Sequence, residues 1–199
     1  YNGSSITIFT KEISGTFLER VKDSVSSFFG VKVNKRFRVG VCSRNLELDL
    51  RNTDNKYINT AMSTGLAVGI RKLSENLGKE LAVQGELCGP GVQGNYYDLD
   101  SLTIYVFDIY DISERKYLLP ADRTGTFSEL QNTYNVTAKH AYVEFSDFRL
   151  PSDDRSVLIA LGEYSLHNRK ENEGLVFKSC ERDFSFKCIS NKFLLKNEQ

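Results

Sequence analysis

Apolar and polar residues alternate along several short stretches of the chain, with the period of two expected of strands that bury one face. The stretches SSITIFTKEI, from Ser4, and KRFRVGVCSRNLELDL, from Lys35, show this pattern. Two later stretches, KELAVQGELCG and SLTIYVFDIYDI, are rich in β-branched and aromatic residues and also predict strands. KHAYVEFSDFRL, GLVFKSC and FSFKCISNKFLL add three further predicted strands.

A different period, one apolar residue every three or four positions, appears between residues 55 and 77 and predicts one amphipathic helix there. Gly78 follows as a stop signal. The predicted buried stripe of this helix consists of Ile58, Met62, Leu66, Ile70, Leu73 and Leu77.

Two further helices are predicted in the second half of the chain. ADRTGTFSELQNTY, which follows Pro120, resembles a short helix. Another helix is expected to begin at Ser152, because its hydroxyl can cap the helix and Asp153 and Asp154 suit the first turn. Its inward-facing residues would be Val157, Leu158, Leu161 and Tyr164.

Strands outnumber helices and do not alternate regularly with them, which favours an α+β fold with mainly antiparallel sheets flanked by helices. The 199 residues suffice for one sizeable core, so we expect a single domain over 1–199. The contents of hydrophobic (40%) and charged (26%) residues argue against a disordered chain. No apolar run approaches the roughly 18 residues that a bilayer span requires.

Charge limits the choice of partners, because Lys plus Arg and Asp plus Glu are equal at 26 each. A polyanion would therefore have to bind a local basic patch. The strongest patch lies in KVNKRFRVG, and it could either hold phosphates or protect an exposed strand edge. Its cationic residues are Lys32, Lys35, Arg36 and Arg38.

Cysteine and histidine provide few signs of a metal site. The four cysteines form no CxxC pair, and we expect them to be reduced, buried thiols. His140 and His167 do not belong to a ligand-spaced cluster, so a zinc site is not expected. GPGVQG also lacks the Lys-Ser/Thr ending of a phosphate-binding P-loop.

Five segments end predicted strands with charged or aromatic residues, as expected of a site built between sheets. CSRN contributes Arg44, VQGELCGPGVQ contributes Glu86 and IYVFDIYD contributes Phe107. The other two segments are EGLVFK, with Glu173 and Lys178, and FSFKCISNKFLLK, with Lys187.

Read after the opening YNGSS, these segments resemble in order the nucleotidyltransferase motifs of the covalent ligase superfamily. They are most similar to ATP-dependent RNA ligases of the nick-sealing (RNA ligase 2-like) type, and GELCGPGVQ followed by YVFDI is the most specific part. The resemblance implies a nucleotidyltransferase (ATP-grasp-like) domain over 1–199. It also implies that a nucleophilic lysine stands immediately before Tyr1, completing KYNG.

The resemblance further implies the reaction and its cofactors. ATP would transfer AMP to that lysine and then to an RNA 5′-phosphate, with Mg²⁺ or Mn²⁺ as the metal, before the RNA ends are joined. Phe107 would stack on adenine, Glu86 would bind a ribose hydroxyl or a metal-bound water, and Arg44 would hold a phosphate. Taken alone, each of these residues could equally be a core aromatic, an exposed strand residue or a solvated turn.

The remaining roles implied by the resemblance belong to Glu173, as a metal ligand, and to Lys187, at the α-phosphate. Asn2 and Gly3 would complete the first motif at the nucleotide, with Asn2 near the metal through water, although many relatives carry Asp at this position. Relatives often have a second lysine two residues after the first, where this chain has Ile189, unless Lys192 substitutes for it.

Lys178 ranks lower because strand parity places it on the opposite face from Glu173.

Several alternatives stay open at this point. The same lysine chemistry would serve a DNA ligase or an mRNA-capping guanylyltransferase, and a non-catalytic nucleotide- or RNA-binding module could lack the nucleophile altogether. As partners we expect RNA ends, from a nicked duplex or a broken strand, and no membrane. We also expect an intracellular monomer.

Overall fold

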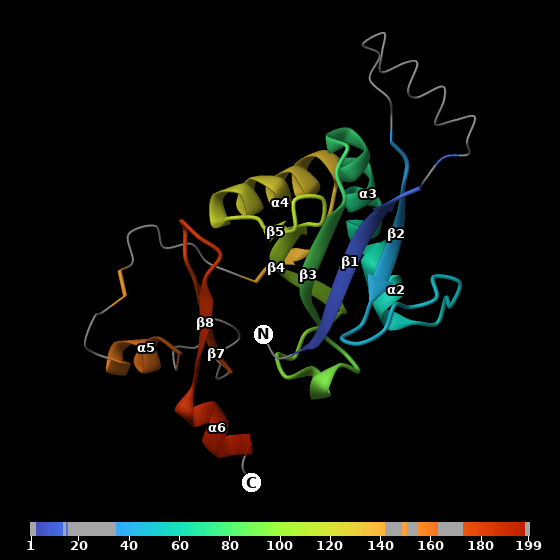
Figure 1. Cartoon of the computed structure of the whole chain (residues 1–199). Helices are drawn as coiled ribbons and strands as arrows, with labels where there is room; N and C mark the ends of the chain where they lie inside the picture. The colour runs from blue at the N-terminus through green and yellow to red at the C-terminus, as the bar shows by residue number, and fades with distance from the viewer. Residues whose placement is uncertain are drawn as a thin grey trace.

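The structure is a computed structural model that describes residues 3–13, 15, 35–141, 149–150, 155–162 and 173–197 (Figure 1). Its strands are β1 (Ser4–Glu12), β2 (Phe37–Cys42), β3 (Leu81–Cys88), β4 (Thr103–Asp111), β5 (Lys116–Tyr117), β6 (Lys139–His140), β7 (Gly174–Lys178) and β8 (Ser185–Ile189). Its helices are α2 (Lys56–Ser63), α3 (Leu66–Leu77), α4 (Pro120–Tyr134), α5 (Arg155–Gly162) and α6 (Asn191–Asn197), with a short 3₁₀ turn at Gln93–Asn95.

The large sheet has the strand order β2-β1-β3-β4-β5, and neighbouring strands along this path are antiparallel. β6 adds a short parallel pairing to β4. β7 and β8 form a second, two-stranded antiparallel sheet. The predicted α+β fold with mainly antiparallel strands is therefore confirmed.

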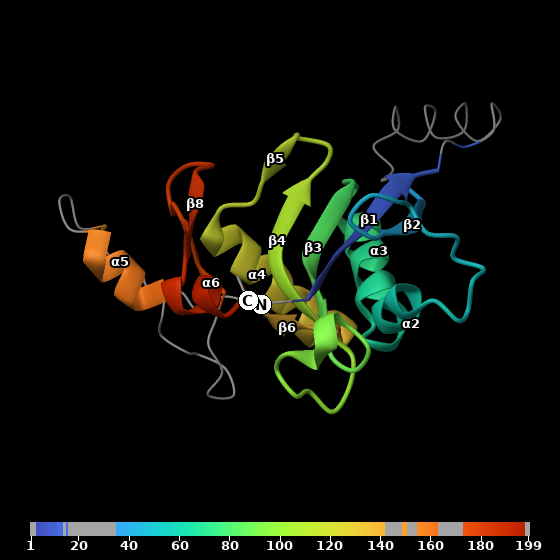
Figure 2. The ribbon, with the colours of Figure 1, turned by 90° about the horizontal axis from the view of Figure 1, so that it is seen from below.

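The core lies between the large sheet and helices α2, α3 and α4, which cover one face of it (Figure 2). Alternate residues of the strands point into this layer, as their period of two predicts. They meet the apolar side of α3, where Leu66, Ile70 and Leu73 are fully buried. The strand residues of the core include Ile6, Ile8, Val41, Val83, Leu87, Ile104, Val106 and Ile109.

The predicted helix over 55–77 is two helices, α2 and α3. Gly65 separates them because its φ of 74° is left-handed, a conformation that ends one helix and that glycine adopts at little cost. Asn55 caps α2 with its side-chain oxygen, and Gly78 ends α3 as expected. Met62 and Leu77, both predicted to be buried, are exposed.

Other boundaries also differ from the predictions. The strand predicted through NLELDL ends at Cys42 and leaves a single bridge to Glu47. The end of FSFKCISNKFLL is helix α6, and of KHAYVEFSDFRL only Lys139–His140 is a described strand, because residues 142–148 lie outside the described ranges. Ser152 to Asp154 and Tyr164 also lie outside them, and Val157 of α5 is exposed rather than inward.

The basic stretch before and within β2 lies at the edge of the large sheet. Lys35 pairs with Glu12 at 2.8 Å, and Arg38 pairs with Glu47 at 3.1 Å. These acidic partners favour the protected strand edge over a phosphate-binding patch. Lys32 lies outside the described residues.

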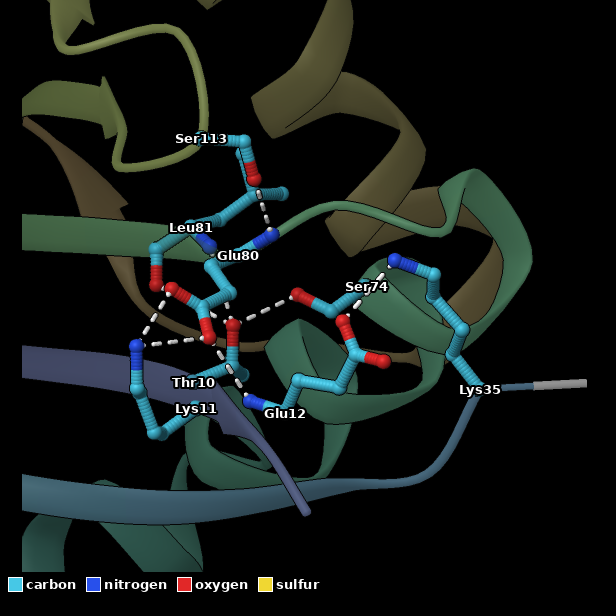
Figure 3. Close-up of polar contacts among 8 residues, drawn as sticks. All are labelled: Thr10, Lys11, Glu12, Lys35, Ser74, Glu80, Leu81 and Ser113. Atoms are coloured by element: carbon cyan, nitrogen blue, oxygen red, sulfur yellow. Dashed lines mark hydrogen bonds and ion pairs between the residues drawn. The ribbon is translucent and has the colours of Figure 1, made fainter. Parts of the chain in front are cut away.

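A polar network fixes the end of β1 to the start of β3 (Figure 3). Glu80 accepts hydrogen bonds from the Glu12 N–H at 2.9 Å and from Lys11 Nζ at 3.0 Å. Burial by itself would raise the pKa of Glu80, but these donors outweigh it and hold that pKa below the ordinary value. Beneath them, the hydroxyls of Thr10 and Ser74 lie 2.8 Å apart in the core.

The four cysteines form no disulfide bonds, as predicted. They were also predicted to be buried, but only Cys88 is, and Cys180 is exposed. In the part of the chain that the structure describes, every helix is too short or too polar to cross a membrane.

Candidate active site

The site residues of the large sheet lie on the face that the helices leave open. In β3, Val83 and Leu87 point into the core, so Glu86 points to the opposite face. Glu86 is paired with Ser5 of β1 on one side and with Tyr105 of β4 on the other. The start of β1 and the middle of β3 therefore face the same space.

A β-bulge in β4 brings Phe107 to this face together with its neighbour Asp108. The pairing with β3 passes from Gln84↔Asp108 to Gly85↔Val106, which leaves Phe107 as the extra residue. Val106 before the bulge and Ile109 after it are both core residues, so the two residues between them share the open face. Phe107 is half-buried there. Alternation along a single strand would have put one of the two residues in the core.

Glu86 is the point at which the predicted residues converge. Its carboxyl is half-buried, and this burial is the main reason that its pKa is raised. The negative charge of Glu173 raises the pKa further, while the positive charges of Lys187 and Arg44 lower it. Three segments far from Glu86 in the sequence thus place their charges around its carboxyl.

Glu173 and Lys187 pair directly, with Glu173 Oε1 2.5 Å from Lys187 Nζ. Gly174, the residue between Glu173 and the rest of β7, has a φ of 151°. A Cβ at this position would lie 2.1 Å from the Cys188 carbonyl oxygen, so only glycine allows this close approach of the two strands. This close approach explains why a glycine, Gly174, follows Glu173 in EGLVFK.

Lys178 belongs to the site more closely than strand parity indicated. It forms an ion pair with Asp108, and its Nζ lies 5.9 Å from the centre of the Phe107 ring. Parity failed because Glu173 precedes β7 and the backbone turns at Gly174, so the alternation does not extend to it.

Val176, which the sequence analysis did not single out, lies on the face of β7 that carries Lys178. It stands opposite Lys187 in the pairing of β7 with β8, and paired residues share a face. Lys178, two positions along, shares that face and contacts Phe107. Val176 is 55% exposed, which is unusual for an apolar strand residue. In the sequence, Val176 is only an apolar residue two positions before Lys178. The strand register is needed to show that it shares a face with Lys187.

Glu86 also lines a cavity of about 440 Å³, which we call the Arg44–Glu86 cavity. It brings Arg44, Glu86 and Gly3 together, as the motif order predicted. A Cβ on Gly3 would lie 2.5 Å from the Leu87 carbonyl oxygen, so β1 can approach β3 this closely only with glycine. The cavity is also lined by Ser5, Ser43 and Gln93.

The donor set suits a hydrated magnesium or manganese ion rather than zinc. Among the described residues, no group of three His, Cys, Asp or Glu side chains is arranged to hold a metal. Two neighbouring carboxylates, Glu86 and Glu173, are what magnesium typically uses when water and substrate phosphates complete its shell. Asn2 lies outside the described residues.

Among the described residues, neither Cys88 nor His140 is placed to act as a nucleophile or a zinc ligand. Burial raises the pKa of the Cys88 thiol to about 12, which keeps it protonated at neutral pH. His140 packs edge-on against Phe127, with ring centres 4.2 Å apart. His167 lies outside the described residues.

Comparisons with known proteins agree with this geometry. The sequence model of the RNA ligase family matches residues 1–190. Among solved structures, a lysine-to-alanine variant of Naegleria gruberi RNA ligase with ATP and manganese has a TM-score of 0.75 and 30% identity, covering 99% of this chain and 50% of that one. The search of curated proteins returned no match.

Two further structures of the Naegleria gruberi enzyme are similar to the chain. The form with pyrophosphate has a TM-score of 0.73 and 30% identity, covering 99% of this chain and 49% of that one. A glutamate-to-alanine variant with AMP and manganese has a TM-score of 0.74 and 30% identity, again with 99% and 49% coverage. The chain thus spans about half the length of the solved proteins it matches.

Proposed function

The chain belongs to the RNA ligase family, and from this premise we propose that it is the adenylyltransferase domain of an ATP-dependent RNA ligase that joins 5′-phosphate and 3′-hydroxyl ends. The observation that carries the proposal is the convergence of Arg44, Glu173 and Lys187 on Glu86. Structures of the Naegleria enzyme with ATP, with AMP and with pyrophosphate support a nucleotide in this position.

The adenine ring is proposed to lie between Phe107 and Val176. An aromatic face on one side and an exposed aliphatic side chain on the other suit a flat, apolar ring. Lys178 fixes this slot from both sides, because it is part of β7 and contacts Phe107 and Asp108 of β4.

The sugar and phosphate would follow from the slot toward the start of β1. Glu86 accepts a hydrogen bond from a ribose hydroxyl, and Lys187 contacts the α-phosphate and spreads its charge. The lysine proposed to precede Tyr1 attacks the α-phosphorus; the new N–P bond forms as the bond to pyrophosphate breaks. Its amine must be neutral to attack, and the positive charge of Lys187 favours the neutral form.

Glu173, Glu86 and, through water, Asn2 are the residues proposed to hold Mg²⁺ or Mn²⁺. A bound divalent ion supplies neutralisation of phosphate charge, which is the main requirement of phosphoryl transfer. The ion pair with Lys187 holds the Glu173 carboxyl in place at the site.

The later steps use the same residues with RNA as substrate. An oxygen of the 5′-phosphate of one RNA end attacks the AMP phosphorus; the new P–O bond forms as the N–P bond breaks and the lysine amine leaves. Arg44 is the cation proposed to hold that 5′-phosphate. The 3′-hydroxyl oxygen of the other end then attacks the phosphorus of the RNA 5′-phosphate. The bond between this phosphorus and the AMP oxygen breaks, AMP leaves, and the hydroxyl proton is released. We propose a nick or a broken strand as the substrate, as in the nick-sealing type.

Incubation of the full-length protein with labelled ATP or labelled GTP, followed by acid treatment, tests the proposal. We expect acid-stable label from ATP, and mass spectrometry should place an AMP-sized increment on the lysine before Tyr1. Label from GTP would indicate a capping enzyme instead. Absence of label with an intact fold would indicate a non-catalytic binding module.

Sealing assays identify the substrate. Nicked duplexes, hairpin breaks and single strands should be compared in RNA and in DNA. We expect joining of RNA nicks; joining of DNA alone would contradict the proposal.

A further inference from the structure

A second cavity, of about 160 Å³, lies where the tip of the β7–β8 hairpin meets the start of α4, and we call it the hairpin cavity. Arg123 of α4 is a buried part of its lining, whereas Arg182 of the hairpin tip is exposed. Asp108 and Lys178, whose ion pair joins the two sheets, also line it. The hairpin cavity therefore spans the junction between the large sheet and the β7–β8 sheet.

The hairpin cavity lies away from the path proposed for the nucleotide. The sugar and phosphates of ATP would run from Phe107 on β4 past β3 toward β1, whereas this cavity reaches β5 through Tyr117. Because β5 pairs with β4 on the side opposite to β3, the cavity and the phosphates of ATP lie on opposite sides of the adenine slot. Its volume is about half that of the smallest usual small-ligand sites, which is enough for one phosphate group but not for a nucleotide.

The charges of the lining suit a single anion of low charge. The charged residues are three cations, Arg123, Lys178 and Arg182, and two carboxylates, Asp108 and Asp183. Three positive charges less two negative charges leave one positive charge. This excess matches the single negative charge of a backbone phosphodiester better than the larger charge of free inorganic phosphate.

Arg182 is the cation of this lining that is most available to a ligand. Asp108 is shared by Arg123, at 3.4 Å, and by Lys178, but no carboxylate of the described residues forms an ion pair with Arg182. The guanidinium of Arg182 lies instead 5.3 Å from the centre of the Phe184 ring, which is 50% exposed. A cation beside an exposed aromatic ring is typical of surfaces that bind a nucleic-acid strand, where the cation holds a phosphate and the ring stacks with a base.

The charge balance of the whole chain makes such a local site necessary for RNA. Positive and negative residues are equal in number, so a polyanion must find a local excess of cations. The patch predicted in KVNKRFRVG does not supply one, because Lys35 and Arg38 pair with glutamates.

We propose that the hairpin cavity binds a backbone phosphate of the RNA substrate, with Arg182 as the main ligand and Phe184 as the stacking surface for the adjoining base. Ser179 and Ser185 also line the cavity, and their hydroxyls can donate to phosphate oxygens. This inference rests on the proposed function, because RNA is the ligand that it assigns.

The test measures binding of the full-length protein to a nicked RNA duplex with a 3′-deoxy end at the nick, so that no sealing occurs. Fluorescence anisotropy gives the Kd over a range of potassium chloride concentrations. Arg182→Gln should raise the Kd roughly tenfold, the size of one charge-assisted contact, and should reduce the steepness of the salt dependence by about one phosphate contact. Arg182→Lys should keep the wild-type salt dependence but bind more weakly, because it keeps the charge and loses the guanidinium fork.

Phe184→Leu separates stacking from charge. It should weaken RNA binding about fivefold to tenfold without changing the salt dependence, because a stacked base displaces no counterion. Arg71→Gln is the matched control for Arg182→Gln: Arg71 is also an exposed arginine, but it lies on α3, on the helix-covered side of the large sheet. The control should keep the wild-type Kd and salt dependence.

Free inorganic phosphate is the other source of the same chemical group. Added at constant ionic strength, it should change the melting temperatures of the wild type and of Arg182→Gln equally. A rise confined to the wild type, together with unchanged RNA binding in Arg182→Gln, would assign the cavity to free phosphate and overturn its role with RNA.

The outcomes separate this inference from the proposed function. An unchanged Kd and salt dependence in Arg182→Gln, in a protein that self-adenylylates with ATP, would overturn the RNA site and leave the ligase function standing. The expected effect of Arg182→Gln in a protein that never self-adenylylates would support the RNA site and overturn the proposed function alone.

Discussion

The two sheets that build the site differ in how firmly they are held. The large sheet is covered by three helices, and residues such as Ile8, Ile70 and Ile104 have no exposed surface. The β7–β8 sheet has short helices beside it and leaves Val176 and Phe184 about half exposed, at 55% and 50%. Yet Glu173 and Lys187, two charged groups near Glu86, come from the β7–β8 region, and Arg44 comes from the loop after β2 of the large sheet.

This difference separates stability from activity. The large sheet fixes Glu86 and Phe107 through the buried core, so their positions are inseparable from folding. Glu173, just before β7, and Lys187, in β8, belong to the β7–β8 sheet region, which we call the thin sheet. Lys178 of β7 joins this sheet to β4 through Asp108 and Phe107. Substitutions in the thin sheet should therefore impair catalysis while changing the free energy of unfolding little.

The largest effect is expected from truncation in the helix-covered layer. Ile70→Ala should lower the free energy of unfolding by about 2–5 kcal/mol, because it removes a fully buried side chain and leaves a cavity. Val176→Ala, in the thin sheet, should cost less than about 1 kcal/mol. Urea denaturation of both variants measures the contrast, and equal losses would show that the two sheets are equally packed.

Lys187→Ala should reduce self-adenylylation about 100- to 1,000-fold, as expected when one donor to a transition-state charge is lost. Its melting temperature should stay within a few degrees of the wild type, because the side chain is 42% exposed. Lys192→Ala, on the exposed surface of α6, is the control that asks whether the second lysine substitutes for the one missing at Ile189. A larger loss in this control than in Lys187→Ala would exchange their roles.

Lys178→Met tests the connection between the sheets. It should raise the KM for ATP about tenfold with a smaller change in kcat, because the adenine slot loses its fixed width but keeps its walls. Asp108 retains Arg123 at 3.4 Å, so folding should persist. A double-mutant cycle with Asp108→Asn should give non-additive effects; additive effects would show that the pair does not act as a unit.

The smallest effects come from two glutamates, Glu80 just before β3 and Glu86 within it, whose pKa values move in opposite directions. Glu80 has a lowered pKa, so its stabilisation is complete above the ordinary value of 4.5 and is lost as the pH falls through the folded-state pKa. Glu86 has a raised pKa, so the folded state is penalised as the pH rises from 4.5 through that raised value.

Glu80→Gln should therefore lower stability at neutral pH, by no more than about 1 kcal/mol. Glu86→Gln should raise stability slightly at neutral pH while abolishing adenylylation. Thermal melts across the acid range measure both, and each variant serves as the control for the other. The same sign of change in the two would contradict the opposite electrostatic environments of Glu80 and Glu86.

Much of the large sheet could be predicted because each strand carries its own pattern. β1, β3 and β4 fall within the stretches that alternate or are rich in β-branched residues. The failures occurred where one residue changes the backbone direction. Gly65 divides the predicted helix, and α6 follows directly after Ser190, which is fully buried where a strand was expected to continue.

The candidate site could be recognised by motif but not assembled. The motifs in the sequence identified Glu86, Glu173, Lys187 and Arg44. Their spacing along the chain, however, does not show that they share one electrostatic environment. The ion pair of Lys178 with Asp108 and the shared face of Val176 and Lys187 were not predicted, since they depend on the position of β7 against β4 and on its pairing with β8. Such relations join residues about 70 positions apart, as with Lys178 and Asp108.

The sequence by itself determined the family, the antiparallel α+β class and the residue types of the site, because hydrophobic periodicity and sequence motifs are local properties of the chain. Only the tertiary structure decided which side chains meet. The bulge that turns Phe107 outward, the turn at Gly174 and the burial of Glu86 all arise from contacts between distant segments. Electrostatic shifts follow the same rule, because a pKa depends on the charges and the solvent around a group in space.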